Sequence, residues 1–252
     1  MNVWVLAGAT AAAAMIAGGI PLLRQVHENA NLMRRLTGIA AGILLASALM
    51  IVIPEGFDIA GEYAGLALLA GFLVMLIFES FGFGHDIHDD HHEHHEHPPA
   101  QANSVVLGLS VHALTDGLAI GAAIASGSTL LTMTILIAVI AHKIPAAFSV
   151  GVFCVAERQD STRAAMDILL FSLATPAAIL LTFFATDGLP LEQLGLAILF
   201  AGGTFLYVAT VDVLPDIHHA ETGKAALFQI LIGAALMIGF LFGLEATGLL
   251  AH

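Results

Sequence analysis

Four ionisable side chains stand within two otherwise apolar stretches of the chain. His112 and Asp116 lie within residues 104–126, and the adjacent pair His142 and Lys143 lies within residues 130–153. A spacing of four residues places His112 and Asp116 on one face of an α-helix. Neutral imidazole and carboxylate groups are suitable ligands for Zn²⁺ and similar divalent cations. These residues therefore predict a metal site formed by His112, Asp116 and His142 between two helices.

Lys143 adds a positive charge beside this predicted site. A lysine far from either end of its helix cannot extend its ammonium group to water. We therefore expect Lys143 to pair with a carboxylate, first of all Asp116, or to be uncharged in a dry site. The alternative for the whole cluster is a buried hydrogen-bonded group that only holds two helices together.

The elements that must position these residues are long apolar stretches. The chain has 252 residues, of which 58% are hydrophobic and only 11% are charged, too few polar residues to cover a soluble domain. Membrane spans need about 20 mostly apolar residues, and we predict eight of them: 2–23, 32–53, 62–83, 104–126, 130–153, 164–186, 194–214 and 225–248. At 1.5 Å per residue, the predicted ligands lie about 12–20 Å into a hydrocarbon core of about 30 Å. The sequence thus predicts an all-α membrane protein with a single transmembrane domain over 1–252.

The basic residues predict the orientation of these spans. Apart from Lys143, the Lys and Arg residues all lie in or next to the loops that follow spans one, five and seven: Arg24, Arg34, Arg35, Arg158, Arg163 and Lys224. Because basic loops face the cytoplasm, both termini are expected outside. The stretch before residue 3 carries no Lys or Arg, so we interpret 2–23 as the first span rather than a signal peptide.

The loop at 84–103 is then cytoplasmic, and its composition is that of an exposed metal-binding tract. Of residues 85–97, seven are His and five are acidic, and such a segment cannot form a core. Its candidate ligands are His85, His88, His91, His92, His94, His95 and His97. A solvated anionic linker is the alternative.

Five further residues are candidates for ion entry or exit. Glu55 follows Pro54 near the outer end of span two, and the others lie near the inner end of span seven: Asp212, Asp216, His218 and His219. Each also has an ordinary interpretation as a helix cap or a solvated surface group. The tripeptides Ile53-Pro54-Glu55 and Leu214-Pro215-Asp216 occupy opposite sides of the membrane, which suggests an inverted repeat of the kind found in secondary transporters.

Four segments resemble the ZIP (Zrt/Irt-like) family of metal transporters, in the order in which that family carries them. They are IVIPEG at 51–56, HALTDGLAIGAA at 112–123, HKIPAAFSVG at 142–151 and GTFLYVATVDVLPD at 203–216. The chain is nearest the branch with HK-x-PAAF in the fifth span. The resemblance implies eight helices in a 3+2+3 arrangement with inverted repeats, and ligand positions that match His112, Asp116 and His142.

The sequence departs from the usual pattern of this family at three positions. Ala113 stands where common relatives have Asn, Lys143 where they have a metal-binding residue, and Ala146 where they have Glu or His. All three departures remove ligands of a second metal ion. We therefore expect a site for a single ion, transported toward the cytoplasm, with Zn²⁺ as the first candidate and Fe²⁺, Mn²⁺ and Cd²⁺ as others.

Other classes of function fit the sequence less well. An intramembrane zinc-dependent hydrolase would need a general base or nucleophile, and the chain has no HExxH or G-x-S-x-G motif. A metal-sensing receptor would differ in not moving metal in liposomes. The net charge of −13 argues against nucleic acid as a partner. We expect no catalytic cofactor. We expect the protein to contact the lipid bilayer and to lie in the cell membrane of a prokaryote or the Golgi or plasma membrane of a eukaryote. A homodimer is one option for assembly.

Overall fold

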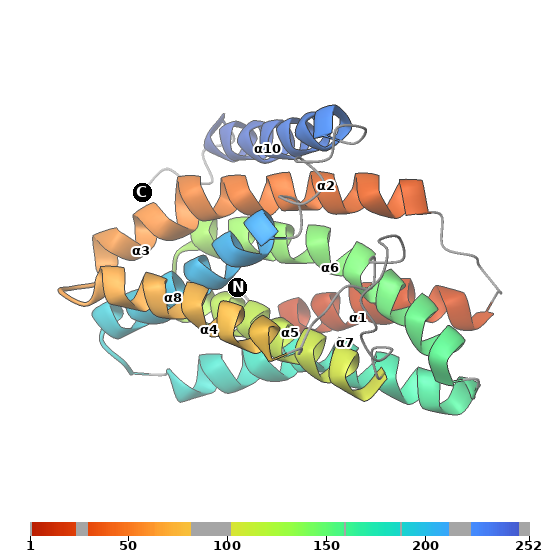
Figure 1. Ribbon diagram of the computed structural model, residues 1–252. Helices are drawn as coiled ribbons and strands as arrows, with labels where there is room; N and C mark the ends of the chain where they lie inside the picture. Colours follow the sequence, from red (N-terminus) through yellow and green to blue (C-terminus); the bar gives the residue numbers. More distant parts are fainter. Residues whose placement is uncertain are drawn as a thin grey trace.

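A computed structural model describes residues 2–23, 30–81, 102–158, 160–186, 188–211 and 223–246. Within these ranges all regular structure is helical (Figure 1). The elements are α1 (Val3–Leu23), α2 (Ala30–Ser47), the short π-helix η1 (Ala48–Val52), α3 (Ile53–Ile59), α4 (Ala64–Ser80), α5 (Ala102–Ala125), α6 (Thr129–Arg158), α7 (Ser161–Ala185), α8 (Leu191–Val211) and α10 (Gly223–Ala246).

Seven apolar helical segments of the described chain are long enough to cross a membrane, and they correspond to seven of the eight predicted spans. The remaining predicted span, 62–83, contains α4, which has 17 residues. At this length α4 extends about 26 Å, slightly less than a hydrocarbon core of about 30 Å. The prediction of an all-α membrane protein is confirmed.

The second span continues past the proline that we expected to end it. The predicted boundary at residue 53 is wrong, because α2, η1 and α3 form one helical segment up to Ile59. Proline has no N–H, and its ring crowds the carbonyl group four residues earlier. Directly before Pro54 the helix widens into η1, where the Ile53 N–H donates to the Ala48 carbonyl oxygen, five residues back. This wider turn gives the proline ring room within a continuous helix.

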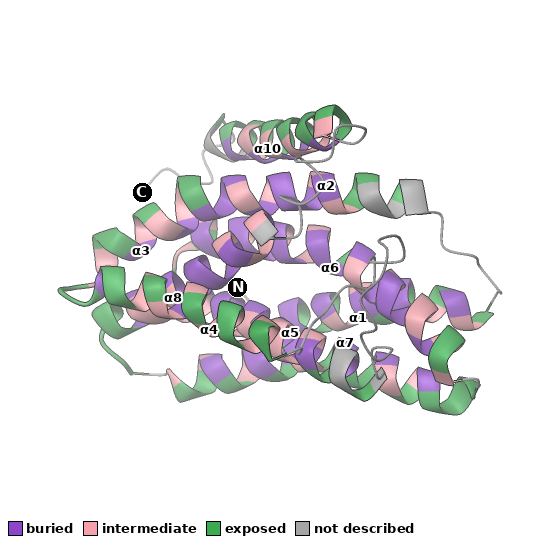
Figure 2. Cartoon of the chain, in the orientation of Figure 1, coloured by how far each residue is buried: buried purple, intermediate pink, exposed green. Residues whose placement is uncertain are grey.

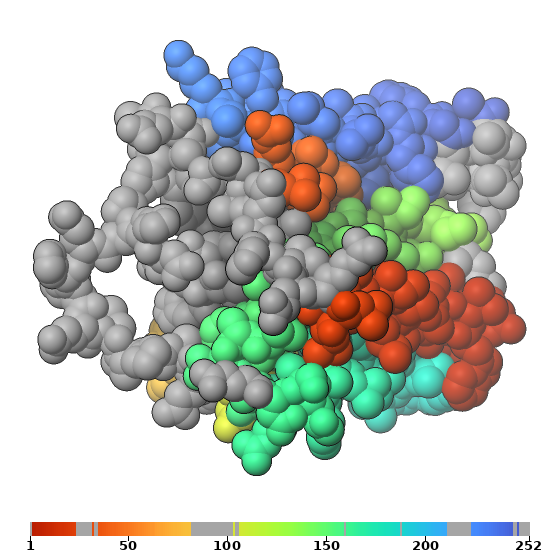
Figure 3. Space-filling model, turned by 90° about the vertical axis from the view of Figure 1, so that its right-hand side faces the viewer, coloured from red at the N-terminus to blue at the C-terminus, as the bar shows by residue number. Residues whose placement is uncertain are grey.

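The helices form two groups in space. α1 and α5 each pack on α6 and α7, which also pack on each other, and we call these four helices the site bundle. α2 with η1 and α3 packs along α10 and α8, and α4 packs along α8; we call these helices the second bundle. The two bundles meet chiefly where α2 lies on α6 and α5 lies on α8. In Figure 3, α10 and α2 lie together at one edge of the molecule, and α1 adjoins α7 further down.

Close approaches between helix backbones occur inside each bundle. In the site bundle, a Cβ added at Gly117 would lie 2.4 Å from the carbonyl oxygen of Thr175, and one added at Gly151 would lie 2.3 Å from that of Gly18. In the second bundle, one added at Gly71 would lie 1.9 Å from the carbonyl oxygen of Phe200. Such small-residue contacts let helices associate tightly in a membrane. None of the tight glycine contacts recorded for the described residues crosses from one bundle to the other.

Burial follows this arrangement (Figure 2). α8, at the boundary, is the most enclosed of the candidate spans: 61% of its residues are buried, against 17% in the span of α10. Buried apolar side chains of both bundles form one continuous cluster at the boundary, which includes Val52, Ile135 and Phe205. The interior of the protein is therefore the contact between the bundles, and α10 is a peripheral helix.

Arg158 links three helices at one end of the site bundle. Its Nε donates to Asp167 Oδ2 of α7 at 2.7 Å, and a terminal guanidinium nitrogen donates to Asn103 Oδ1 of α5 at 2.5 Å. Charge-assisted bonds from a planar guanidinium group also fix orientation. The ends of α5, α6 and α7 are thereby held together.

Candidate metal centre

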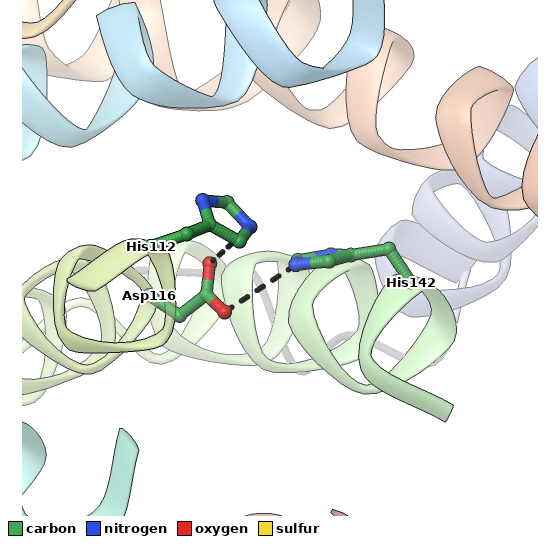
Figure 4. A group of neighbouring side chains, drawn as sticks. All are labelled: His112, Asp116 and His142. Carbon is green, nitrogen blue, oxygen red and sulfur yellow. Dashed lines mark ion pairs between the residues drawn. The ribbon is translucent and has the colours of Figure 1, made fainter. Parts of the chain in front are cut away.

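Two helices bring the three predicted ligands together. His112 and Asp116 lie one turn apart on α5, and His142 lies on α6. Measured along the helices, these residues lie about 15–21 Å from the first residue of α5 or α6, roughly halfway through a bilayer core. Figure 4 shows both imidazole rings turned toward the carboxylate between them. Because the ligands come from regular helices, the backbone fixes their relative positions.

The distances between the ligand atoms suit one metal ion. His112 Nε2 lies 3.7 Å from Asp116 Oδ1, and His142 Nε2 lies 3.4 Å from Asp116 Oδ2. The ligand atoms of the three residues all lie within 4.8 Å of one another. Tetrahedral zinc with bonds of about 2.0–2.1 Å needs ligand atoms about 3.3 Å apart. Small side-chain movements would thus complete the coordination.

The polar atoms of this cluster lack other partners. Both ring nitrogens of His112, Oδ1 of Asp116 and Nε2 of His142 are buried and have no hydrogen-bond partner in the structure. The Asp116 side chain is only 1% exposed. Unpaired buried carboxylates and imidazoles are unfavourable, so these atoms are suited to bind a ligand. A divalent cation could bind Oδ1 of Asp116, Nε2 of His142 and one ring nitrogen of His112.

The imidazole of His142 is held in the tautomer that suits metal binding. Its Nδ1 lies 2.8 Å from the carbonyl oxygen of Ala138, one turn earlier on α6. When Nδ1–H donates to this carbonyl, Nε2 carries the lone pair and faces Asp116. A backbone acceptor of this kind commonly orients a metal-binding histidine.

The second bundle supplies an apolar wall beside the site. The ring of Phe205 on α8 lies edge-on to the ring of His142, with 6.4 Å between the centroids. Phe205 is fully buried. The metal centre therefore belongs to the site bundle but faces the boundary between the bundles.

Lys143 is buried beside the site, but it does not form the expected ion pair with Asp116. Its Nζ donates to Thr175 Oγ1 on α7 at 2.6 Å and lies 4.5 Å from the centre of the Phe171 ring. The ion pairs between described residues do not include Lys143. The ammonium of Lys143 is thus bonded to α7 and not to the carboxylate.

The remaining predicted site residues are not part of this cluster. Glu55 lies in the first turn of α3 and is half-buried. Asp212, Asp216, His218 and His219 lie outside the described residues, as do all seven histidines of the loop. Among the described residues, His112, Asp116 and His142 form the one group of His, Cys, Asp and Glu side chains that could hold a metal ion.

Sequence reasoning missed Thr175 and Phe205. Thr175 precedes Pro176 in an apolar stretch, and a threonine there usually bonds within its own helix. A phenylalanine in a membrane span is an ordinary apolar residue, so the sequence does not indicate that it lies beside a metal site. Both residues become visible as neighbours of the site only when α7 and α8 are placed against α5 and α6.

Comparison with known proteins identifies the class and then the family. Residues 84–241 match the family model described as ZIP Zinc transporter. The chain is 29% identical over 279 residues to Zinc transporter ZIP9-A of Xenopus laevis, covering 91% of each protein. It is 29% identical over 263 residues to Zinc transporter ZIP9 of Micropogonias undulatus, covering 82% of this chain and 84% of the relative.

A shorter match, to the human Zinc transporter ZIP2, is 33% identical over 144 residues and covers 55% of this chain and 46% of the relative. Together with seven helices long and apolar enough to cross a membrane and a buried group of side chains that could hold a metal ion, these matches define an integral membrane transporter of divalent metal ions, not an enzyme. The chain belongs to the ZIP zinc transporter family.

Proposed function

We propose that the protein carries Zn²⁺, or a divalent ion of similar preference, toward the cytoplasm one ion at a time through His112, Asp116 and His142. The observation that carries this proposal is the set of four buried nitrogen and oxygen atoms without partners in this cluster. Three protein ligands leave a fourth tetrahedral position for water. An open position allows ligands to exchange, which a transported ion needs and a structural ion does not.

The orientation of the protein in the membrane is inferred from the basic residues. All six Lys and Arg residues outside the fifth predicted span lie on one predicted side, which we propose is cytoplasmic. Both termini would then be external. The 3+2+3 arrangement with inverted repeats, and assembly as a homodimer, are further proposals, of which the first rests on the family resemblance.

The arrangement of the helices supports a mechanism for access. Tight backbone contacts lie inside the bundles, whereas the boundary between them consists of apolar side chains. Secondary transporters commonly change access by moving one rigid group of helices against another. We propose that the site bundle moves relative to the second bundle, and that Phe205 leaves the side of His142 during this movement.

Uptake by purified protein in liposomes tests the transport site. His112→Ala, Asp116→Ala and His142→Ala should each reduce zinc uptake to background while the folded protein remains in the membrane, because three ligands leave none to spare. Glu62→Gln, which alters an exposed acid at a turn, is the matched control and should transport normally. Near-normal uptake by a protein carrying both Asp116→Ala and His142→Ala would refute the proposal.

The number of ions can be counted directly. Anomalous scattering from zinc-loaded protein should show one ion between α5 and α6. Neither Ala113 nor Ala146 carries a ligand atom, and the Lys143 ammonium would repel a second dication. Two well-occupied ions at this position would contradict a single-ion site.

We also propose that the histidine-rich segment 84–103 captures metal on the cytoplasmic side. Its composition, with seven His and five acidic residues in 85–97, supports this role. Deleting residues 85–97 should leave transport working, reduce the number of zinc ions bound per protein, and change the dependence of uptake on zinc concentration. A folded deletion variant with no transport would show that the loop belongs to the transport path.

A further inference from the structure

A chain of two hydrogen bonds connects three helices next to the metal site. Lys143 Nζ on α6 donates to Thr175 Oγ1 on α7 at 2.6 Å, and Thr175 Oγ1 donates to the carbonyl oxygen of Ala113 on α5 at 2.8 Å. Lys143 is 1% exposed and Thr175 is fully buried. Water therefore cannot easily replace either bond.

The chemistry of the groups fixes the direction of this chain. An ammonium group can only donate, and a hydroxyl has one hydrogen and two lone pairs. The Thr175 hydrogen points at Ala113, so its lone pairs are left for Lys143. The threonine side chain is also stiff at χ1, whereas lysine has a flexible four-carbon stem. Thr175 therefore decides where the ammonium group stays.

The hydrogen bond to Thr175 leaves the ammonium outside the ion pairs of the ligand carboxylate, which are with His112 and His142. The ammonium lies 4.5 Å from the centre of the Phe171 ring, which adds a cation–π contact on the side of α7. Oδ1 of Asp116 has no hydrogen-bond partner in the structure. An ammonium without its acceptor on α7 would have this oxygen as an attractive alternative, because bonds between charged groups are the strong ones.

We propose that Thr175 is a positioning residue for metal transport: it holds the Lys143 ammonium on α7 and so leaves Asp116 free to bind the transported ion. This proposal rests on the single-ion transport site proposed above. The positive charge of Lys143 then remains near the carboxylate without occupying the oxygen that the metal needs. Incoming zinc does not have to displace an internal salt bridge.

Thr175→Val tests this role, because valine keeps the shape and removes the acceptor. The ammonium should then bind Asp116, and zinc must compete with it. We expect the KM for zinc uptake in liposomes to rise about tenfold, the value of one charge-assisted hydrogen bond, with a much smaller change in maximal rate. Thr175→Ser keeps the hydroxyl and should restore the KM.

A neighbouring hydroxyl provides the matched control. Ser172 lies one turn earlier on α7, is fully buried, and its Oγ has no hydrogen-bond partner in the structure. Ser172→Ala should leave the KM unchanged. A rise in KM for Ser172→Ala equal to that for Thr175→Val would show that any lost hydroxyl on α7 has this effect, and would overturn the proposal.

Lys143→Met separates positioning from a structural role. Methionine keeps the length of the side chain and removes its charge, so Thr175→Val should add no further change in KM when combined with Lys143→Met. An equal rise in KM in both backgrounds would mean that Thr175 only packs the helices. Loss of folded protein for both Thr175→Val and Thr175→Ala, with Thr175→Ser intact, would likewise assign it a structural role and overturn the proposal.

The same preparations distinguish this proposal from the function on which it rests. Zinc bound per wild-type transport site is counted by anomalous scattering. Two ions per site would refute single-ion transport itself. One ion per site, together with an unchanged KM for Thr175→Val, would refute only the positioning role.

Discussion

The carboxylate of Asp116 shows how a single residue can be unfavourable for folding and suited to bind a metal ion. It is 1% exposed, and its Oδ1 has no hydrogen-bond partner in the structure. Moving a carboxylate from water into the protein interior costs roughly several kcal/mol of free energy unless a partner compensates. The imidazoles of His112 and His142, at 3.7 and 3.4 Å, compensate only in part when they are neutral. The metal-free site is therefore strained electrostatically, and this favours binding of a cation.

Zinc should consequently stabilise the folded protein. A ligand that binds only the native state adds about 2.7 kcal/mol at a concentration 100-fold above its Kd. We expect the thermal unfolding midpoint of detergent-solubilised protein to rise with zinc concentration. Asp116→Asn should abolish this rise, because the amide is a weaker ligand without charge, and the Glu62→Gln control should retain it. An equal zinc-dependent rise in Asp116→Asn would place the stabilising metal elsewhere.

The residues of the site differ in how well the sequence predicts them. His112, Asp116 and His142 were predicted because ionisable groups in apolar stretches are rare and because their spacing defines a helix face. The partner of Lys143 was not predictable. A countercharge can be guessed from the sequence, but an acceptor such as Thr175, 32 positions away, depends on how α7 packs against α5 and α6.

At the scale of elements, the contact between α5 and α7 holds the site together. Gly117 directly follows Asp116, and its lack of a side chain lets α5 reach the backbone of α7 at Thr175. The Ala113 carbonyl meets the Thr175 hydroxyl one turn earlier on α5. The same close approach therefore brings both Ala113 and Gly117 of α5 into contact with Thr175 of α7.

Gly117→Ala should disturb this register. Its Cβ would lie 2.4 Å from the Thr175 carbonyl oxygen and 2.5 Å from Ala178 Cβ, so the helices must separate. We expect a loss of about 1–3 kcal/mol in stability, as for overpacking, together with reduced zinc uptake. Gly8→Ala is the control, since an added Cβ on α1 meets nothing within 4 Å. Chemical denaturation and liposome uptake measure both effects, and equal behaviour of the two variants would contradict this account.

The helices themselves were largely predictable, and the exception has a local cause. Hydropathy locates spans because every backbone polar group in a bilayer must bond internally. The same signal cannot tell whether a proline ends a helix or is accommodated by one. Pro54 is accommodated because the five residues Ala48–Val52 form a π-helix just before it. Nothing in the sequence of these five residues indicates that geometry.

For the whole molecule, the two bundles should behave as separate rigid bodies. The protein has a single cysteine, Cys154, so spin labels can be placed at chosen sites after Cys154→Ser. Exposed positions suited to labelling are Val5 on α1, Met166 on α7 and Phe228 on α10. The distance between Met166 and Phe228 should change by several ångströms when zinc or a pH gradient is applied, because it spans the boundary.

The distance between Val5 and Met166 is the internal control, because both labels lie on the site bundle. It should stay constant under the same conditions. Double electron–electron resonance measures each distance in its own doubly labelled protein, in the same kind of membrane preparation. Parallel changes in both pairs would indicate that the bundles deform rather than move as units.

The buried ammonium of Lys143 also has an electrical consequence. In the transport site that we propose, the Asp116 carboxylate and the Lys143 ammonium together carry no net charge without metal, and would carry two positive charges with one zinc ion bound. Two charges gain about 4.6 kcal/mol on crossing a potential of about 100 mV that is negative inside. We therefore expect such a voltage to favour inward movement of the zinc-loaded site and to leave the return of the empty site almost unaffected. The charge of one buried lysine would then confine the effect of the membrane potential to the loaded step.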